Sequence, residues 1–570
     1  MIAALRRRVG RGHALALVGA ALALAAAPFL LLPYPLTLLT LALVYGLFAF
    51  GLDIAWGRAG VVSIGHAAFF GLGAYGAAIA SARDIPVLLG VAGGVVAALV
   101  LALVIGLAGL GRRALASTMA VLTLALTLAV SQGARSWTGL TNGSNGLVVL
   151  SDSGVVGTYY RTAGIVLGTV VVVWLIVLRG SLGRRFVAIR LNQQRAEHLG
   201  IDPWRTKLIA LLISAGISAL AGAVAAPVIG LISPSISGIV MSTEVLVWLA
   251  VGGLGTITGA FLGAGLVTIG NQLLGDVIGS WYLLMMGVLF LLVVRFAPEG
   301  LVGVVRSVIR RPLREKAAGG AVLAGTGAPP PDRSTATAGG PVLRARDVEK
   351  DFGPVPVIQG IDLDVAAGEV VCLIGPNGAG KTTFLAVLAG EHVPERGRVW
   401  IAGRDVTARP AHERARMGLG RMFQIPSVFL ELTPAQNLAL ARAEGVHPPA
   451  PLALYDRFTS TDDMLAKDLP LADRRALELA MALSWGPEIL LLDEPAAGLS
   501  HEDSVALART LREVAERTGC TLVAVEHDME IVRELADRVV VLADGRILVE
   551  GSMDEVSAHD EVRRAYLGVA

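Results

Sequence analysis

The first half of the chain contains long stretches without a single charged side chain. They run over 14–32, 36–52, 59–82, 86–111, 114–134, 162–178, 208–243, 245–275 and 277–294. About 20 consecutive apolar residues are enough for a helix to cross a lipid bilayer. This part of the chain is therefore expected to be an all-α polytopic membrane domain.

Two of the stretches are expected to contain a break. The stretch 208–243 is too long for one crossing and is expected to break around Pro234, in "LISPSISG". The stretch 245–275 is a second candidate, because "GGLGTITG" lies in its middle. About ten crossings follow from these stretches. The arginine-rich start, followed by "HALALVGAALALAAAP", resembles a cleaved signal peptide, but an uncleaved helix is favoured because further crossings follow it.

Clusters of positive charge lie between the apolar stretches. Such clusters stay on the cytoplasmic side of a membrane, and ten crossings would place all of them there. They are Arg6, Arg7, Arg8 and Arg11, then Arg112 and Arg113, then the loop 179–207, and finally Arg306, Arg310, Arg311 and Arg314. The same count leaves 135–161, with "GLTNGSNGL", on the outer face.

The charge balance reverses along the chain. Up to Lys316 there are 23 Lys/Arg and 9 Asp/Glu, a net +14, and the remainder holds 25 and 37, a net −12. The basic residues form short clusters without interleaved aromatic residues, so they indicate membrane topology and not a nucleic-acid surface. Cys372 and Cys520 both lie in the acidic half and are expected to be reduced core thiols.

Three regions follow from these patterns. Residues 1–312 form the expected transmembrane domain, and 313–341, rich in Gly, Ala, Pro, Ser and Thr, the expected flexible linker. In 342–570, strand-like runs such as "EVVCLIG", "EILLLDE" and "TLVAVEH" alternate with helical segments, which is typical of an α/β domain. Asp544-Gly545 between two apolar runs predicts a hairpin.

A glycine-rich loop follows the first of these strands and opens a helix. Its glycines let the backbone wrap around phosphates, Lys381 supplies a cation for the β- and γ-phosphates, and the Thr382 hydroxyl reaches Mg²⁺. The expected ATP-binding residues of this loop are Gly375, Pro376, Asn377, Gly378, Ala379, Gly380, Lys381, Thr382 and Thr383.

A pair of acids follows the apolar strand 488–492. Asp493 at the end of a buried strand is suited to hold the Mg²⁺ shell, and Glu494 is suited to orient the attacking water. An acidic pair at the start of a helix is the alternative. The phosphate loop upstream makes the catalytic interpretation the favoured one.

With these motifs in order, the second half resembles the ATP-binding-cassette (ABC) ATPases. The resemblance implies that Gln424 in "RMFQIP" contacts Mg²⁺ and couples to the membrane partner. It implies that His527 touches the γ-phosphate and that Phe352 stacks on adenine. Glu494, His527 and Gln424 are thus the expected catalytic residues, and Thr382, Gln424 and Asp493 the expected Mg²⁺ ligands.

The motif that normally clasps ATP of the opposite subunit departs from the family pattern. In "LPLADRRALELAMAL" (469–483), Pro470 replaces a serine and Ala472 a glycine. Ala472 adds a methyl group where close backbone approach is wanted. Ser500 replaces the usual Asp or Asn in "AAGLS", which weakens an expected contact between the two active sites. The chain is expected to hydrolyse ATP when a partner supplies an intact signature.

The first half resembles the permeases of branched-chain amino-acid importers. The matching stretches are 51–78, "GLTNGSNGL" (139–147) and 242–264, and "RAEHLGID" (195–202) resembles the segment that docks into the ATPase near Gln424. Asp53, His66 and Glu244 are ionisable groups inside this half and are functional candidates. His66 either lines a substrate path or hydrogen-bonds between helices, and the second role is favoured. A solvated or capping role is an equal alternative for Glu244.

Together the two resemblances imply a permease fused to its ATPase in a binding-protein-dependent ABC importer. It would lie in the bacterial inner membrane, in contact with lipid, with its ATPase domain in the cytoplasm and ATP and Mg²⁺ as cofactors. A second permease, a second ABC ATPase and a periplasmic substrate-binding protein are the implied partners. Branched-chain amino acids are the favoured cargo, with urea, short amides and aromatic acids as alternatives. A membrane-tethered ATPase that acts as a regulator or sensor, and a homodimeric exporter, are the rival interpretations.

Overall fold

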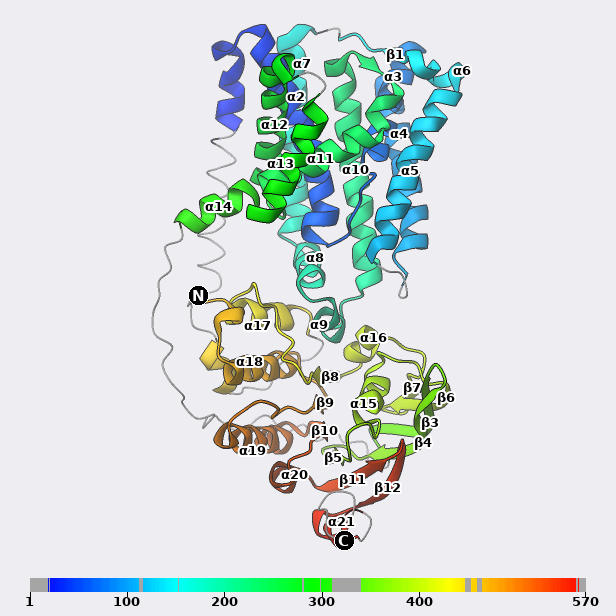
Figure 1. The fold of residues 1–570 in the computed structure, drawn as a ribbon, viewed down its shortest axis with the longest axis vertical. Helices are drawn as coiled ribbons and strands as arrows, with labels where there is room; N and C mark the ends of the chain where they lie inside the picture. Colours follow the sequence, from blue (N-terminus) through cyan, green and yellow to red (C-terminus); the bar gives the residue numbers. More distant parts are fainter. Residues whose placement is uncertain are drawn as a thin grey trace. The chain divides into compact units, whose positions relative to one another are not determined.

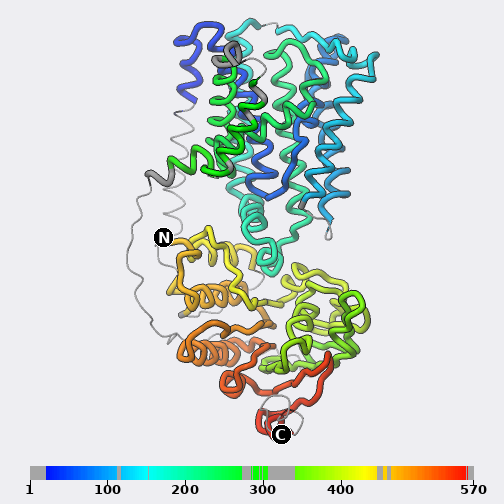
Figure 2. The backbone as a smooth tube through the Cα atoms, in the orientation of Figure 1, coloured from blue at the N-terminus to red at the C-terminus, as the bar shows by residue number. Residues whose placement is uncertain are grey.

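The computed structural model describes residues 19, 21–111, 116–151, 153–278, 281–297, 299–309, 340–445, 453–458, 464–559 and 562. These residues belong to two units (Figures 1 and 2). One unit comprises Met1–Arg190 and Trp204–Glu315, and the other comprises Leu191–Pro203 and Lys316–Ala570. The short segment 191–203 therefore groups with the second unit, although it is inserted in the first. Residues 313–339 of the expected linker lie outside the described residues.

The first unit is built from helices, with one two-residue antiparallel strand pair between β1 (Leu147–Val148) and β2 (Leu231–Ile232). A helix over Ala21–Leu30 comes first among the described residues. It is followed by α2 (Pro33–Asp53), continued by a π-helical turn over Ile54–Arg58, α3 (Ala67–Ala82), α4 (Val87–Gly109), α5 (Ala116–Ser136), α6 (Thr138–Thr141), α7 (Gly154–Val173), continued by a π-helical turn over Trp174–Leu178, α8 (Ser181–Leu191), α10 (Pro203–Ile229), α11 (Ile239–Gly252), α12 (Ile257–Ile278), α13 (Tyr282–Phe296) and α14 (Gly300–Ile309).

Five described helices are long and apolar enough to cross a membrane, and the pair α11–α12, bent by 119°, is a sixth candidate. The five lie in Pro33–Arg58, Val87–Gly109, Ser117–Ser136, Gly154–Leu178 and Pro203–Ile229. This number is below the expected ten. One reason is that 59–66, inside an expected crossing, is not helical, so α3 is left with 16 residues. The first apolar stretch is only partly described.

Both expected breaks are confirmed. Helix α10 ends at Ile229 and α11 begins at Ile239, so the chain leaves the helix around Pro234. A second interruption separates Gly252 from Ile257. Backbone outside regular helices is tolerated at membrane depth only where the protein buries it.

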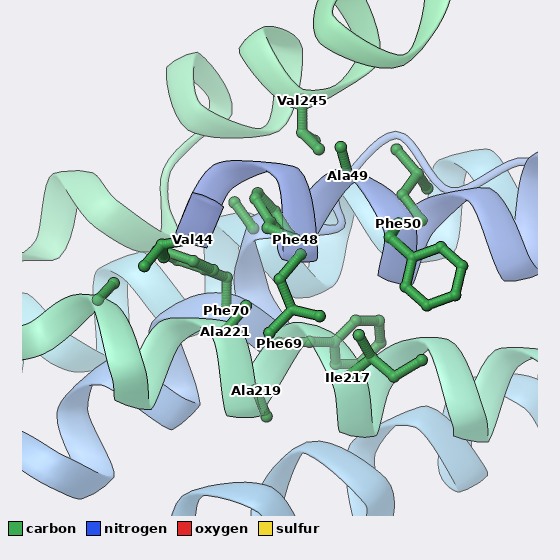
Figure 3. Close-up of a cluster of buried hydrophobic side chains, with 14 of the residues drawn as sticks. Val44, Phe48, Ala49, Phe50, Phe69, Phe70, Ile217, Ala219, Ala221 and Val245 are labelled. Atoms are coloured by element: carbon green, nitrogen blue, oxygen red, sulfur yellow. The ribbon is translucent and has the colours of Figure 1, made fainter. Parts of the chain in front are cut away.

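The hydrophobic core of the first unit lies where α2, α3, α10 and α11 meet. Figure 3 shows Val44, Phe48 and Phe50 of α2 and Phe69 and Phe70 of α3 beside residues of α10 and α11, and all of these side chains are buried. Helices α3 and α10 approach closely because glycines lie between them. A Cβ added at Gly73 would lie 1.7 Å from the Ala219 carbonyl oxygen, and one at Gly222 would lie 1.8 Å from that of Phe70. Small residues at such crossings hold membrane helices together.

The second unit contains two sheets. The six-stranded sheet has the order β12-β11-β5-β10-β9-β8, with its strands parallel except for β12. A four-stranded antiparallel sheet has the order β4-β3-β6-β7. The strands are β3 (Leu343–Phe352), β4 (Val355–Val365), β5 (Val370–Ile374), β6 (Arg396–Ile401), β7 (Arg404–Asp405), β8 (Leu419–Met422), β9 (Ile489–Asp493), β10 (Thr521–Val525), β11 (Arg538–Ala543) and β12 (Arg546–Gly551). The α/β architecture of this half confirms the predicted fold class.

The helices of this unit include one from the inserted segment. They are α9 (Gln193–His198), α15 (Lys381–Ala389), α16 (Ala411–Arg416), α17 (Pro434–Ala443), α18 (Leu471–Leu483), α19 (His501–Thr518), α20 (Met529–Leu535) and α21 (Met553–Ala558). Strands β5, β9 and β10 are buried throughout, as expected for the centre of a parallel sheet. The predicted hairpin is present: Asp544 and Gly545 join β11 to β12 with positive φ at both positions.

Candidate active site

The glycine-rich loop lies between β5 and α15. Gly375, Gly378 and Gly380 all have positive φ, and a Cβ at Gly375 would lie 2.1 Å from the Leu542 carbonyl oxygen. Only glycine meets both demands at that position. The Lys381 ammonium donates to the carbonyl oxygens of Gly375 and Pro376, at 2.6 and 2.9 Å, so it lies over the loop. Burial lowers the pKa of Lys381, although Glu494 and Asp493 raise it.

The carboxylate of Asp493 faces this loop from the carboxyl end of β9. The Thr382 hydroxyl donates to Asp493 Oδ1 at 3.1 Å. Asp493 is 2% exposed, and burial raises its pKa. A hydroxyl and a buried carboxylate side by side are the hard oxygen ligands that Mg²⁺ prefers. The residues present therefore fit the ion.

Gln424 and Glu494 meet at the same edge. Gln424 Nε2 donates to Glu494 Oε2 at 2.9 Å. Glu494 has a φ of 44°, which is costly for a residue with a side chain, and its backbone N–H donates to the Val525 carbonyl at 3.0 Å. This conformation turns the glutamate out of the strand direction and towards Gln424.

The end of β10 contributes the neighbouring residues. Val525 is paired with Asp493 in the sheet, so Glu526 and His527 follow at the level of Glu494. Glu526 is 1% exposed, and burial raises its pKa to about 7. Its carboxylate accepts from the Ala496 N–H at 3.3 Å. The sequence reasoning did not single out Glu526, because a glutamate beside a histidine carries no signal of its burial.

The remaining predicted contacts lie elsewhere in the unit. Phe352 ends β3, and its half-exposed ring meets the edge of His392 at 5.3 Å between centroids. Pro470 is the N-cap of α18 and makes no side-chain hydrogen bond to the helix. Ser500 caps α19, with its hydroxyl 3.2 Å from the Asp503 N–H. This capping role was not foreseen, although serine before an acidic helical turn is a known signal.

Segment 191–203 is seated on the ATPase, as the resemblance of "RAEHLGID" led us to expect. Asn192 caps α9 by accepting from the Arg195 N–H at 2.9 Å, and its amide donates to Ser427 Oγ at 3.0 Å. Arg195 is 1% exposed and donates to the carbonyl oxygens of Arg421 and Glu478, at 2.9 and 3.2 Å. The seat therefore lies beside the loop that carries Gln424.

Helix α18 holds that loop from the other side. The buried Glu478 accepts from the Phe423 N–H at 3.1 Å, and Arg475 donates to the carbonyl oxygens of Phe423 and Gln424. Burial raises the pKa of Glu478, while Arg195 lowers it. The backbone on either side of Gln424 is thus fixed by two charged side chains.

The ionisable candidates of the first unit are held by local contacts. His66 is fully buried, with Nε2 3.0 Å from Ser214 Oγ and 2.9 Å from Ser218 Oγ, and Nδ1 3.1 Å from Ser63 Oγ. These bonds support the structural role favoured for His66. Asp53 pairs with Arg58 Nε at 3.1 Å and accepts from the Gly255 N–H at 2.6 Å, which links the end of α2 to the interruption between α11 and α12. Glu244 lies within α11.

Comparison with known proteins divides the chain in the same manner. Residues 34–294 match the family model described as branched-chain amino acid transport system / permease component, and 358–497 match the model described as ABC transporter.

The similar curated proteins match 40% of this chain. The lipopolysaccharide export system ATP-binding protein LptB of Acidithiobacillus ferridurans is 36% identical over 236 residues, 97% of its length. The high-affinity branched-chain amino acid transport ATP-binding proteins LivG of Salmonella typhimurium and BraF of Pseudomonas aeruginosa are 32% and 30% identical, each over 99% of its length. A solved ATP-binding cassette of an ABC transporter in its ADP conformation is 24% identical, with a TM-score of 0.36, over 40% of this chain and 99% of that one.

Proposed function

Because the chain belongs to the ABC transporter family and joins a permease component to an ABC ATPase in one polypeptide, we propose that it is a fused subunit of an importer served by a substrate-binding protein. The ATPase domain hydrolyses ATP, and the hydrolysis is coupled to transport. The observation that supports this proposal is the docking of segment 191–203 beside Gln424 through hydrogen bonds. A tethered ATPase that transports nothing has no need of a membrane-domain segment seated there.

Branched-chain amino acids or similar small polar solutes are the proposed cargo. The permease model matched by 34–294 is named for branched-chain amino acid transport, and so are LivG and BraF. The similarity to LptB, named for an export system, means that the cassette alone does not specify direction or cargo. The permease half therefore carries this support, with urea, short amides and aromatic acids as alternative cargoes.

The proposed chemistry follows from the positions of the side chains. Lys381 and the backbone N–H groups of the glycine-rich loop bind the phosphates of ATP. Thr382, Gln424 and Asp493 would hold Mg²⁺, which neutralises charge on the phosphates when bound. Glu494 orients the water that attacks the γ-phosphorus, with ADP leaving, and His527 contacts the γ-phosphate. Phe352 stacks on the adenine.

The proposed assembly contains a second permease, a second ABC ATPase and a periplasmic substrate-binding protein. In this arrangement ATP bound at Lys381 is clasped by the signature of the partner ATPase. Pro470 and Ala472 of this chain then face the ATP of the partner. The first unit lies in the bacterial inner membrane among lipids, and the ATPase lies in the cytoplasm. The arginine clusters support this orientation.

Uptake by cells that express the complete complex tests the proposal. Labelled leucine, isoleucine and valine, with urea and phenylalanine as comparison solutes, would be supplied to cells with Glu494→Gln. We expect uptake to fall by about 100-fold or more, because the variant no longer orients the water. Glu516→Gln, an exposed change on α19, is the control and should transport normally. Uptake that is the same with and without Glu494 would favour the tethered regulator.

A further inference from the structure

Three side chains connect segment 191–203 to the carboxylate at the end of β9. Burial lowers the pKa of the first of them, His198, so this imidazole takes part as a hydrogen-bond donor to a carboxylate and not as a cation. His198 Nε2 lies 2.7 Å from Glu391 Oε1, and Arg421 Nη1 lies 2.6 Å from the same oxygen. Arg421 Nη2 lies 3.5 Å from Asp493 Oδ2. We refer to His198, Glu391, Arg421 and Asp493 as the ion-pair chain. It ends on the oxygen pair formed by Asp493 and Thr382.

The ion-pair chain is shielded from water. The side chains of His198, Glu391, Arg421 and Asp493 are 1%, 19%, 4% and 2% exposed. Charges in such surroundings interact much more strongly than charges at the surface. Burial raises the pKa of Glu391, but the hydrogen bond to His198 and the charge of Arg421 outweigh it and lower the pKa to about 2. Glu391 is therefore ionised.

The two middle members of the ion-pair chain, Glu391 and Arg421, are attached to the helix that follows the glycine-rich loop and to segment 191–203. Glu391 follows Gly390, the C-cap of α15, and its N–H donates to the Ala386 carbonyl at 3.0 Å. It is thus fixed to the helix that begins at Lys381. On the other side, Arg195 of segment 191–203 donates to the Arg421 carbonyl oxygen at 2.9 Å. Segment 191–203 therefore contacts Arg421 directly and also reaches it through Glu391.

We propose that Glu391 and Arg421 are positioning residues that set how tightly Asp493 holds Mg²⁺, and that His198 makes this setting depend on segment 191–203. The charges give the reason. With Glu391 present, one guanidinium is shared between two carboxylates, and Asp493 keeps negative charge for the ion. Without that charge, Arg421 turns fully to Asp493 and competes with Mg²⁺.

The inference rests on the proposed function because it assumes that segment 191–203 moves during transport. Loss of the His198 contact would leave Glu391 entirely to Arg421, which frees Asp493 to bind Mg²⁺. The conformation of the membrane domain would then affect Mg²⁺ binding at Asp493 by a route that does not include Gln424.

Binding of a fluorescent ATP analogue to the purified full-length complex, titrated with Mg²⁺, tests the proposal without requiring transport. Glu391→Gln should raise the apparent dissociation constant for Mg²⁺ about fivefold or more, and binding of the ATP analogue should recover at high Mg²⁺. Glu391→Asp, which keeps the charge, should recover part of the shift. His198→Gln should lower the apparent dissociation constant, because it leaves Glu391 entirely to Arg421, and it should have no further effect in the Glu391→Gln background.

Glu369→Gln is the matched control. Glu369 is also 19% exposed and also pairs with a partly buried arginine, Arg538 at 2.7 Å, but it precedes β5 at the end of the strand away from the glycine-rich loop. A Mg²⁺ constant in Glu391→Gln equal to that in Glu369→Gln would overturn the positioning role. Additive effects of His198→Gln and Glu391→Gln would overturn the link to segment 191–203. Either failure is distinct from failure of the proposed function, which shows as absent uptake with normal nucleotide binding.

Discussion

Protonation of Glu526, a buried side chain near the ATP site, makes the stability of the fold depend on pH. Its carboxyl has a pKa of about 7 in the folded protein, raised mainly by burial, against 4.5 for the ordinary group. The folded state therefore binds the proton more strongly than the unfolded state. The stability that this proton contributes is complete at low pH and is lost as pH rises from about 4.5 to about 7.

We predict that Glu526→Gln makes the ATPase domain less sensitive to pH. The amide keeps the shape and has no charge to desolvate. As pH rises from 5 to 8, the free energy of unfolding of the variant should therefore increase relative to that of the natural chain by on the order of 3 kcal/mol. Thermal unfolding of both proteins at several pH values measures the difference. A constant difference across this range would show that Glu526 does not titrate there.

At the scale of elements, the crossing of α3 with α10 depends on glycines that leave no room for a side chain. We predict that Gly73→Ala destabilises the membrane domain by about 1–3 kcal/mol, because its methyl group would meet the Ala219 carbonyl oxygen. Thermal unfolding in detergent measures this effect.

Gly93→Ala in α4 is the matched control. An added Cβ at Gly93 meets nothing within 4 Å, and helices favour alanine over glycine. Equal stability of the two variants would mean that α3 shifts to accept the methyl group at Gly73.

Several elements were predicted correctly, and each of them depends only on residues that are close together in the sequence. Asp544-Gly545 requires only two neighbouring residues with positive φ, and the interruption near Pro234 and that in "GGLGTITG" follow from residues within the break. The glycine-rich loop with Lys381 is equally local. Their order along the chain was sufficient to indicate the fold of the second unit.

Other features depend on contacts between distant segments and were not predictable. Glu391 meets His198 across 193 positions of sequence, and a glutamate after a helix end usually faces water. Arg421 and Glu526 are hidden for the same reason: their burial is decided by neighbouring strands. The non-helical stretch 59–66 was missed because its composition is as apolar as that of the helices beside it.

At the scale of the whole molecule, the altered signature makes partner choice the decisive property. Pro470 gives α18 no side-chain cap and no hydroxyl for a nucleotide. In a complex with a different ATPase, only the ATP of that partner would meet this defect. In a homodimer, both ATP molecules would meet it.

We predict that native mass spectrometry of the complex, purified through a tag on this chain, finds a second permease and a second ATPase at equal stoichiometry. Restoring the signature with Pro470→Ser and Ala472→Gly should then raise ATP hydrolysis at one of two sites. A homodimer that gains activity at both sites would contradict the heteromer.

The seat of segment 191–203 has a consequence for synthesis. A ribosome adds roughly 5–20 residues per second, so Glu478 is made on the order of tens of seconds after Arg195. During that interval the carbonyl groups that receive the Arg195 side chain do not yet exist, and the segment has to wait without them. The nascent membrane domain thus carries an unfinished docking site. Completion of the ATPase is the event that closes it, in the same polypeptide and at a fixed one-to-one ratio.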